Sequence, residues 1–256
     1  MMKIEQLAVR YPGGVQALQR TTLDLRAGEC TVLLGCSGAG KSTLLRSLNL
    51  LQTPTEGRVI SDRAGVIEGG AAIRAHRRDT AMIFQQHQLL PRASVLRNTL
   101  LGRLGHHGLW RSMLPLPADE RRLALESLSR VNLLDKALSR ADQLSGGQQQ
   151  RVGIARALTQ QAAIVLADEP VASLDPAASR IVLSLLRDVC RERGLTANVS
   201  LHQVEYTREF ADRVVGLADG AVVFDDHPDK LTDRALHAIY GDRATGPAES
   251  PARVAA

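Results

Sequence analysis

A glycine-rich string that ends in lysine and serine is the part of this sequence best suited to chemistry. Its three glycines allow the backbone to curl so that several N–H groups point inward toward a polyanion. A helix that begins near Lys41 would add the positive end of its dipole. We therefore expect a triphosphate site in which Lys41 reaches the β- and γ-phosphates, Ser42 binds Mg²⁺ and Thr43 supports the α-phosphate. The string reads Gly35-Cys36-Ser37-Gly38-Ala39-Gly40-Lys41-Ser42.

Two adjacent carboxylates follow the apolar run 164–167, which has the pattern of a buried strand. A carboxylate just past such a strand lies at the carboxyl edge of the sheet, where ligands bind in open α/β sheets. Asp168 is the expected acidic partner of the metal. Glu169 is placed to polarise a water molecule against the γ-phosphate.

Another anion site is predicted by the string Leu144-Ser145-Gly146-Gly147-Gln148. Ser145 can cap a helix over about 148–158, and Gly146 and Gly147 leave the first N–H groups of that helix bare. One chain then carries two half-sites for phosphate. If the fold holds them apart, two copies of the chain must face each other, which predicts a homodimer that closes only with ATP bound.

The segments around the glycine-rich string have the pattern of a strand, a loop and a helix. Residues 31–34 form a compact apolar run that ends in glycine, which predicts a buried strand feeding the loop. Leucines at 44, 45, 48 and 51 then recur at helical spacing, and Pro54 and Gly57 are expected to end that helix. Upstream, the alternation of apolar and polar residues over 1–30 predicts short antiparallel strands.

The remaining sequence alternates between predicted strands and helices. Core strands are expected over 81–84 and 197–201, and Asp219-Gly220 is expected to turn a hairpin over 214–224. Asp175-Pro176 predicts a helix start with Asp175 as N-cap, and Gly194 predicts its end. The Leu- and Arg-rich segment between about 86 and 143 is interrupted by Gly and Pro, and it predicts a helical subdomain.

Composition limits the class of protein. The chain has 256 residues, 44% of them hydrophobic, which suits one large α/β domain or two small ones. The net charge is +5 without a dense Lys/Arg run, so nucleic acid is not an expected partner. Its three separated cysteines do not indicate a disulfide scaffold or a zinc site. No segment reaches the ~20 apolar residues of a membrane span, so any membrane role must act through a partner.

The glycine-rich string and the 144–148 string together resemble the ATP-binding cassette (ABC) family of ATPases, over about residues 3–240. The resemblance implies a phosphate-loop NTPase fold of the α/β class, with a mostly parallel sheet flanked by helices, an N-terminal antiparallel β subdomain and an inserted α-helical subdomain. It implies one ABC ATPase domain over 1–240, with the nucleotide-binding core at about 1–85 and 151–240 and the helical subdomain at about 86–150. Residues 241–256 are expected to form a disordered tail.

The family's motifs occur here in the expected order, and they imply further roles. Tyr11 matches the aromatic residue that stacks on adenine. Gln85 matches the glutamine that contacts metal and water and links to the transport subunit. His202 matches the histidine that contacts the γ-phosphate and, with Gln85, orients the water that Glu169 activates. Asp175 belongs to a loop that crosses the dimer interface, where it joins residues 145–148 in binding the nucleotide.

Strings over nearly the whole chain resemble the ATP-binding proteins of phosphonate importers, including Pro170–Pro176 and Ala211–Leu217. They imply an ATPase that couples ATP hydrolysis to phosphonate import. An importer of phosphite or another solute stays open, as does a cassette-like subunit of a soluble phosphonate-degrading complex. Soluble cassette ATPases acting on ribosomes or DNA usually carry two cassettes or a long coiled coil, and neither is visible. The 144–148 string disfavours a plain phosphate-loop kinase.

The resemblance also implies partners and a location. Integral membrane permease subunits would dock on the ATPase homodimer at the cytoplasmic face of the inner membrane, and an extracytoplasmic solute-binding protein would supply the solute. Two residues have open roles. Cys36 lies where many relatives carry proline or asparagine, and its place beside a helix N-terminus suggests a reactive thiol, with an inert small residue as the alternative. Trp110, the only tryptophan, is either a permease contact or a core anchor.

Overall fold

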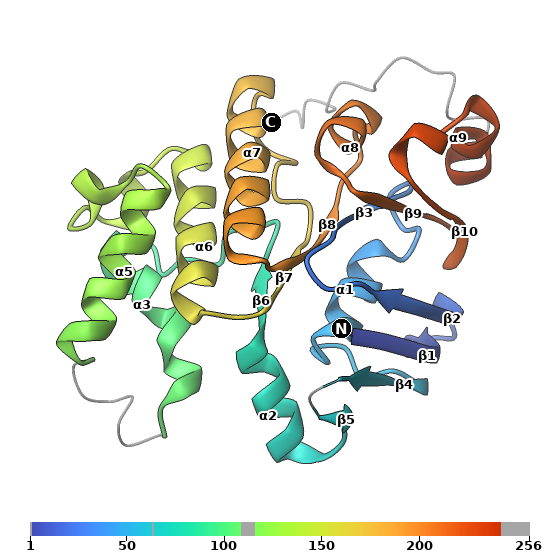
Figure 1. The fold of residues 1–256 in the computed structure, drawn as a ribbon, viewed down its shortest axis with the longest axis horizontal. Helices are drawn as coiled ribbons and strands as arrows, with labels where there is room; N and C mark the ends of the chain where they lie inside the picture. The colour runs from blue at the N-terminus through green and yellow to red at the C-terminus, as the bar shows by residue number, and fades with distance from the viewer. Residues whose placement is uncertain (1, 63, 109–115, 242–256) are drawn as a thin grey trace.

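A six-stranded sheet forms the centre of the computed structural model, which describes residues 2–62, 64–108 and 116–241 (Figure 1). The strand order is β10-β9-β3-β8-β7-β6, and every neighbouring pair is parallel except β9 with β10. The strands of this sheet are β3 (Cys30–Leu34), β6 (Thr80–Ile83), β7 (Ile164–Ala167), β8 (Thr196–Ser200), β9 (Arg213–Ala218) and β10 (Ala221–Asp226).

A second, antiparallel sheet packs beside the first and contains the N-terminal strands (Figure 1). Its order is β2-β1-β4-β5, so the first strand is central and pairs with strands on both sides. Its strands are β1 (Met2–Arg10), β2 (Gln16–Leu25), β4 (Glu56–Ser61) and β5 (Gly65–Val66).

Helices cover the six-stranded sheet and extend away from it on the side of β6 (Figure 1). The α-helices are α1 (Lys41–Leu48), α2 (Gly69–Asp79), α3 (Val95–Leu100), α5 (Ala118–Arg130), α6 (Gly146–Gln160), α7 (Pro176–Arg193), α8 (Val204–Phe210) and α9 (Asp233–Tyr240). Short 3-10 turns are η1 (Leu101–His106), η2 (Leu134–Lys136), η3 (Ala141–Gln143) and η4 (Pro228–Lys230).

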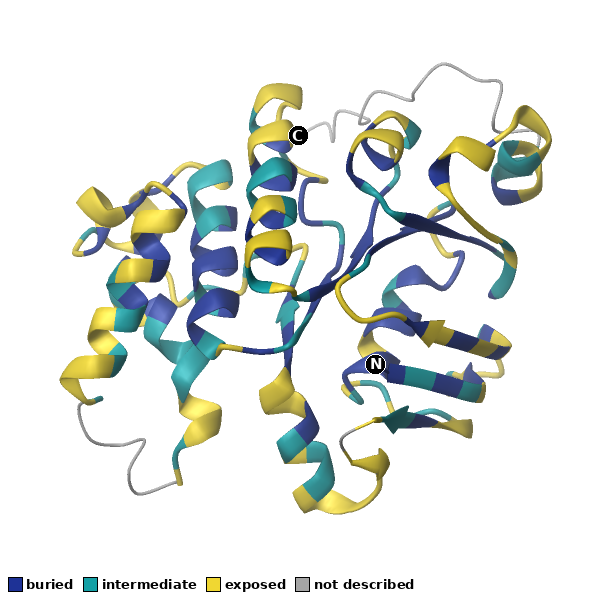
Figure 2. Ribbon diagram, in the orientation of Figure 1, coloured by how far each residue is buried: buried dark blue, intermediate teal, exposed yellow. Residues whose placement is uncertain are grey.

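The six-stranded sheet separates two apolar cores, because alternate residues of a strand point to opposite faces. On one face, Leu33 and Leu166 pack with α1 and the antiparallel sheet. On the other face, Val32 and Val165 pack with α6 and α7. All five residues of β3 are buried, as expected for a strand of a sheet covered on both sides (Figure 2). The carboxyl ends of β3, β7 and β8 are therefore held rigidly at one edge.

The predicted α/β fold with its antiparallel subdomain is confirmed, and two helix boundaries differ from those expected. Helix α1 starts at Lys41 as expected but ends at Leu48, so the helical spacing does not continue to Leu51. Leu50 has a left-handed φ of 54°, and the Leu51 N–H donates to the Arg46 carbonyl at 2.8 Å, the bond that closes a Schellman motif. Apolar periodicity carries no information about a left-handed residue.

Ser145 caps helix α6 as expected, and the helix starts directly after it at Gly146 rather than near Gln148. The helix also crosses the boundary expected near residue 150.

Among the described residues, no helix is both long enough and apolar enough to cross a membrane. Trp110 and residues 242–256 of the expected tail lie outside the described residues.

Candidate functional site

The glycine-rich loop lies between β3 and α1, pressed against two backbone segments. A Cβ on Gly35 would lie 2.4 Å from the carbonyl oxygen of Leu217, at the end of β9. A Cβ on Gly40 would lie 2.6 Å from the carbonyl oxygen of Ala17, and Gly40 has a φ of 100°. Only glycine fits at these two positions. We call this loop, residues 35–40 at the start of α1, the cradle, because the backbone N–H groups at a helix start suit an anion.

Lys41 is the cation of this cradle, and it is only 4% exposed. Its Nζ donates to the carbonyl oxygens of Gly35 at 2.7 Å and Cys36 at 3.0 Å. Burial lowers the pKa of Lys41, and the nearby charges of Glu169 and Asp168 oppose that shift. The ammonium group is thus held by the loop at the point where a polyanion would need it.

Asp168 is the centre of a polar cluster at the end of β7, and it is 2% exposed. The Ser42 hydroxyl donates to its Oδ1 at 2.7 Å, and the Ser200 hydroxyl donates to the same atom at 3.2 Å. Arg46 forms an ion pair with Oδ2 at 3.4 Å. A buried carboxylate beside a serine hydroxyl is an oxygen donor set that suits a hard cation such as Mg²⁺.

Glu169 and His202 form the second polar pair of the site. The His202 Nε2 lies 2.6 Å from the Glu169 Oε1, and the Glu169 N–H donates to the Ser200 hydroxyl at 2.8 Å. The hydrogen bond from His202 lowers the pKa of Glu169, opposed by burial and assisted by the charges of His202 and Lys41. Glu169 also has a left-handed φ of 47°. Its carboxylate is therefore held ionised and in one orientation, as a general base requires.

Tyr11 reaches the same loop from the end of β1. Its hydroxyl lies 3.1 Å from the Thr43 Oγ1, in the first turn of α1. This contact places the phenol at the side of the cradle, beside the residue expected to support the α-phosphate. Stacking of its ring on adenine stays a proposal.

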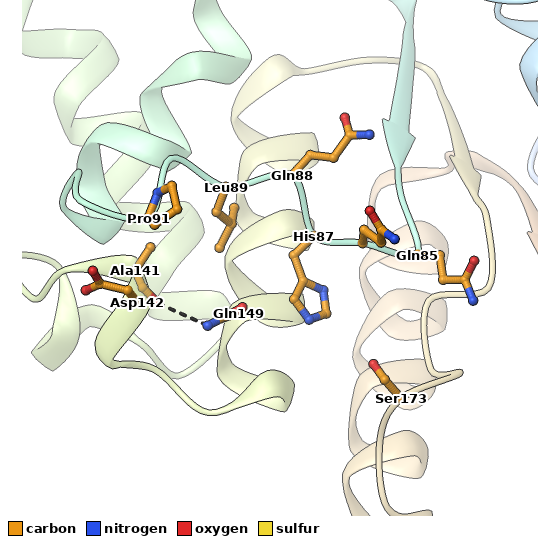
Figure 3. A pocket seen from close by; sticks show the side chains of 10 residues that line it. Gln85, His87, Gln88, Leu89, Pro91, Ala141, Asp142, Gln149 and Ser173 are labelled. Atoms are coloured by element: carbon orange, nitrogen blue, oxygen red, sulfur yellow. Dashed lines mark hydrogen bonds between the residues drawn. The ribbon is translucent and has the colours of Figure 1, made fainter. Parts of the chain in front are cut away.

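Gln85 follows β6, whose Ile83 pairs with Ala167 just before Asp168, and it lines a cleft of about 690 Å³ between β6 and the helical segment 86–143 (Figure 3). The cleft is also lined by Gln149 at the start of α6 and by Ser173 in the loop before α7. Next to Gln85, the His87 Nδ1 is hydrogen-bonded to the Gln150 side chain, which ties this stretch to α6. Gln85 therefore lines the cleft where the end of β6 meets the helical segment.

The 144–148 string forms a separate half-site at the start of α6. Ser145 is the N-cap, with its hydroxyl accepting from the Gln148 N–H at 3.4 Å, and the Gln148 side chain accepts from the Ser145 N–H at 3.0 Å. This capping box is stronger local support than the serine cap expected from sequence. Gly146 and Gly147 form the first turn of the helix.

The start of α6 and the start of α7 share a hollow of about 430 Å³. Asp175 lines it and caps α7, since its Oδ1 accepts from the Ala178 N–H at 2.9 Å. The described residues that line this hollow come from 132, 145–151 and 173–182, and the glycine-rich loop contributes none of them. The structure thus brings Asp175 and the 145–148 residues together, apart from the Lys41 cradle.

Two residues of the cradle were missed by sequence reasoning. Ser200 joins Asp168 to the Glu169 backbone, and it lies at the end of β8 just before the Leu201-His202 dipeptide. Arg46 pairs with Asp168 and follows Ser42 by one helical turn, so the i, i+4 spacing could have indicated it. Nothing in the sequence alone indicates Ser200, because its contacts depend on how β7 and β8 pair.

Comparisons with known sequences agree with this geometry. The family described as ABC transporter matches residues 18–172. The chain is 62% identical over 253 residues to the phosphite import ATP-binding protein PxtA of Stutzerimonas stutzeri, covering 98% of this chain and 92% of that protein. It is 53% identical over 242 residues to the phosphonates import ATP-binding protein PhnC 3 of Nostoc sp., covering 94% of this chain and 92% of that protein.

Solved structures are similar as well. The ATP-binding cassette MJ0796, in a dimeric post-hydrolysis state bound to ADP and Pi, is similar with a TM-score of 0.79 and 34% sequence identity. That similarity covers 89% of this chain and 99% of the cassette. CbiO1 from Clostridium perfringens, part of the ABC transporter complex CbiONQ, is similar with a TM-score of 0.79 and 28% identity, covering 92% of each chain.

Proposed function

The chain belongs to the ABC transporter family, and from this premise we propose that it is the ATP-hydrolysing subunit of an importer for phosphonates or phosphite. The near-full-length similarity to the phosphite and phosphonate import proteins is the observation that carries this choice of solute class. The cradle around Lys41 supplies the site for the nucleotide.

ATP binding follows from the geometry of the cradle. The triphosphate would lie against the N–H groups of the loop between Gly35 and Gly40, where a Cβ at either glycine would clash with neighbouring backbone. Lys41 would exchange its two carbonyl partners for the β- and γ-phosphates. Tyr11, beside Thr43, would stack on the adenine.

The donor set around Asp168 fits Mg²⁺. Ser42 would be a direct ligand, and Asp168 and Gln85 would hold the outer side of the metal shell. When bound, the ion neutralises charge on the β- and γ-phosphate oxygens. Arg46 and Ser200 keep the Asp168 carboxylate in position for this role.

Hydrolysis would be carried out by the Glu169–His202 pair. The Glu169 carboxylate accepts a proton from water as the water oxygen bonds to the γ-phosphorus, and the bond from that phosphorus to the bridging oxygen of ADP breaks. His202 holds Glu169 at 2.6 Å, and it would also face the γ-phosphate. Gln85 would help to orient the same water.

The second half-site would complete the nucleotide site in a head-to-tail homodimer. The N–H groups at the start of α6 and the Asp175 loop lie in a hollow apart from the cradle, so each would face the ATP held by the other copy. The dimeric state of the similar cassette MJ0796 supports this arrangement. Replacing ATP by ADP and phosphate adds charge repulsion and opens the dimer.

Membrane coupling would run through the cleft that contains Gln85. The cleft joins β6 to the helical segment (Figure 3), so a permease element bound there would sense movement between these parts. We place the ATPase at the cytoplasmic face of the inner membrane, bound to permease subunits, with an extracytoplasmic solute-binding protein delivering the solute. The helical subdomain at about 86–150 would carry this contact, and the core at about 1–85 and 151–240 would bind nucleotide.

Reconstitution tests the proposed function. The ATPase, its candidate permease and its candidate binding protein are placed in proteoliposomes, and ATP hydrolysis is measured with phosphite, methylphosphonate and sulfate. We expect stimulation by phosphite or methylphosphonate and none by sulfate. Equal rates with all three anions, or co-purification with a soluble phosphonate-degrading assembly instead of the permease, would contradict the importer role.

A further inference from the structure

Helix α9 ends directly against the nucleotide cradle. Thr232 caps the helix, and Ile239 packs onto β9 where Gly216 has no side chain: a Cβ at Gly216 would lie 2.5 Å from Ile239. Arg208 of α8 donates to the Leu231 carbonyl oxygen at 2.7 Å and holds the segment before the helix. The last residue of α9, Tyr240, is thereby placed at the edge of the loop that follows β3.

Tyr240 contacts two separate parts of the cradle. Its hydroxyl donates to the His202 carbonyl oxygen at 3.1 Å. The Gly35 backbone beside the same hydroxyl lowers its pKa, against the larger effect of burial. Its own carbonyl oxygen lies 3.9 Å from the Cys36 Sγ. Burial raises the pKa of Tyr240 to about 12, so the hydroxyl keeps its proton and remains a donor at any physiological pH.

Both backbone partners of Tyr240 carry groups that act on phosphate. The Gly35 carbonyl oxygen accepts from the Lys41 Nζ at 2.7 Å. The His202 ring holds Glu169 at 2.6 Å. One phenol from the C-terminal helix is therefore bonded to the backbone of the histidine and lies beside the backbone that holds the cation.

We propose that Tyr240 is a positioning residue for ATP hydrolysis, which acts through the His202 backbone to hold the imidazole between Glu169 and the γ-phosphate. The inference rests on the proposed function of His202. Without the hydroxyl, the residues after β8 lose their tie to the phosphate loop, and His202 samples orientations in which it faces neither Glu169 nor phosphate. Binding of ATP depends on the loop N–H groups and Lys41, so it changes less than the rate of hydrolysis.

The test is Tyr240→Phe, which keeps the ring and removes only the hydroxyl. We expect kcat for ATP hydrolysis to fall about fivefold, the effect of losing one hydrogen bond that positions His202, with KM for ATP changed less than about twofold. Tyr206→Phe is the matched control, because the Tyr206 hydroxyl also donates to a backbone carbonyl, that of Pro176 at 3.5 Å, away from the cradle. That control should retain the wild-type rate.

A double-mutant cycle with His202→Ala separates positioning from general stability. Single-turnover hydrolysis of labelled ATP resolves the low rates, and circular dichroism melting monitors the fold. If Tyr240 acts through His202, Tyr240→Phe has no further effect in the His202→Ala background. An equal fall in both backgrounds, or a wild-type kcat for Tyr240→Phe, would overturn the inference. A His202→Ala variant with full activity would instead refute the proposed role of His202, whatever Tyr240→Phe does.

Discussion

The cradle around Lys41 and the hollow at the start of α6 offer phosphate two different kinds of site. The cradle contains a buried cation, a buried carboxylate with a serine hydroxyl, and a carboxylate held by histidine. The hollow offers the capped N-terminus of a helix, and its carboxylate, Asp175, is occupied in capping α7. Its arginine, Arg151, donates to the Val131 carbonyl at 2.9 Å.

The cradle is therefore suited to the chemical step, and the hollow is suited to binding phosphate. The groups proposed to move protons and hold metal lie in one chain at one sheet edge, where the paired strands β7 and β8 fix their spacing. Among the described lining residues of the hollow, the one carboxylate, Asp175, accepts a capping hydrogen bond from the Ala178 N–H. A second copy would therefore add groups that bind ATP but no group that takes part in proton transfer.

Removal of the proposed general base is the most direct test of the chemistry assigned to the Lys41 cradle. Glu169→Gln should lower kcat by about 10²- to 10⁴-fold, the usual contribution of general base catalysis, while leaving ATP binding intact. Under the proposed mechanism hydrolysis opens the dimer, so this variant should accumulate as an ATP-bound dimer, measured by size-exclusion chromatography with light scattering. Glu126→Gln, at an exposed position of α5, is the control and should behave as wild type. A Glu169→Gln protein that stays monomeric in saturating ATP would contradict the proposed ATP-bound dimer.

Complementation between variants tests whether the two half-sites are shared across copies. Lys41→Ala removes the cation of the cradle, and Ser145→Arg obstructs the hollow from an exposed position. Each variant alone should lose more than about tenfold in activity. Mixed, they should recover roughly a quarter of the wild-type rate, since half of randomly paired dimers are mixed and each has one complete site of two. No recovery on mixing would mean that both half-sites serve the same chain.

The pH dependence of hydrolysis tests the hydrogen bond between His202 and Glu169 in the cradle. His202 holds the pKa of Glu169 below its ordinary 4.5, so the base stays ionised and the acid limb of kcat lies below that pH. A depressed carboxyl pKa stabilises the fold above the unfolded-state pKa, and this contribution is lost as pH falls through the folded-state pKa. In His202→Ala the acid limb should move upward, measured by single-turnover rates and by ¹³C NMR titration of Glu169. An unmoved limb would show that another group sets this pKa.

The sequence could predict the main residues of the cradle better than the residues that hold them in position. Lys41, Ser42 and Glu169 lie in contiguous motifs beside strong strand signals, so their types and places followed from local pattern. The hydrogen bond from Ser200 to Asp168 depends on how strands β7 and β8 pair. The hydrogen bond from Tyr240 to His202 depends on helix α9 packing against Gly216 of β9. Helices α2 and α9 and strand β4 were not predicted, because their exposed or short apolar patterns resemble those of loops.

Thiol labelling gives the smallest expected effect and sharpens the comparison, because the cradle has a thiol and the hollow has none among its described lining residues. Burial raises the pKa of Cys30 and of Cys190 to about 12, which leaves the partly exposed Cys36 as the reactive site for a maleimide. Modification should inhibit hydrolysis. If the cradle binds ATP without a partner, ATP at ten times its Kd should slow labelling about tenfold even in dilute monomer. The rate of Cys36→Ser should not change on treatment. Equal labelling with and without ATP would place the nucleotide away from Cys36, and protection seen only in the dimer would mean that the cradle needs the hollow in order to bind.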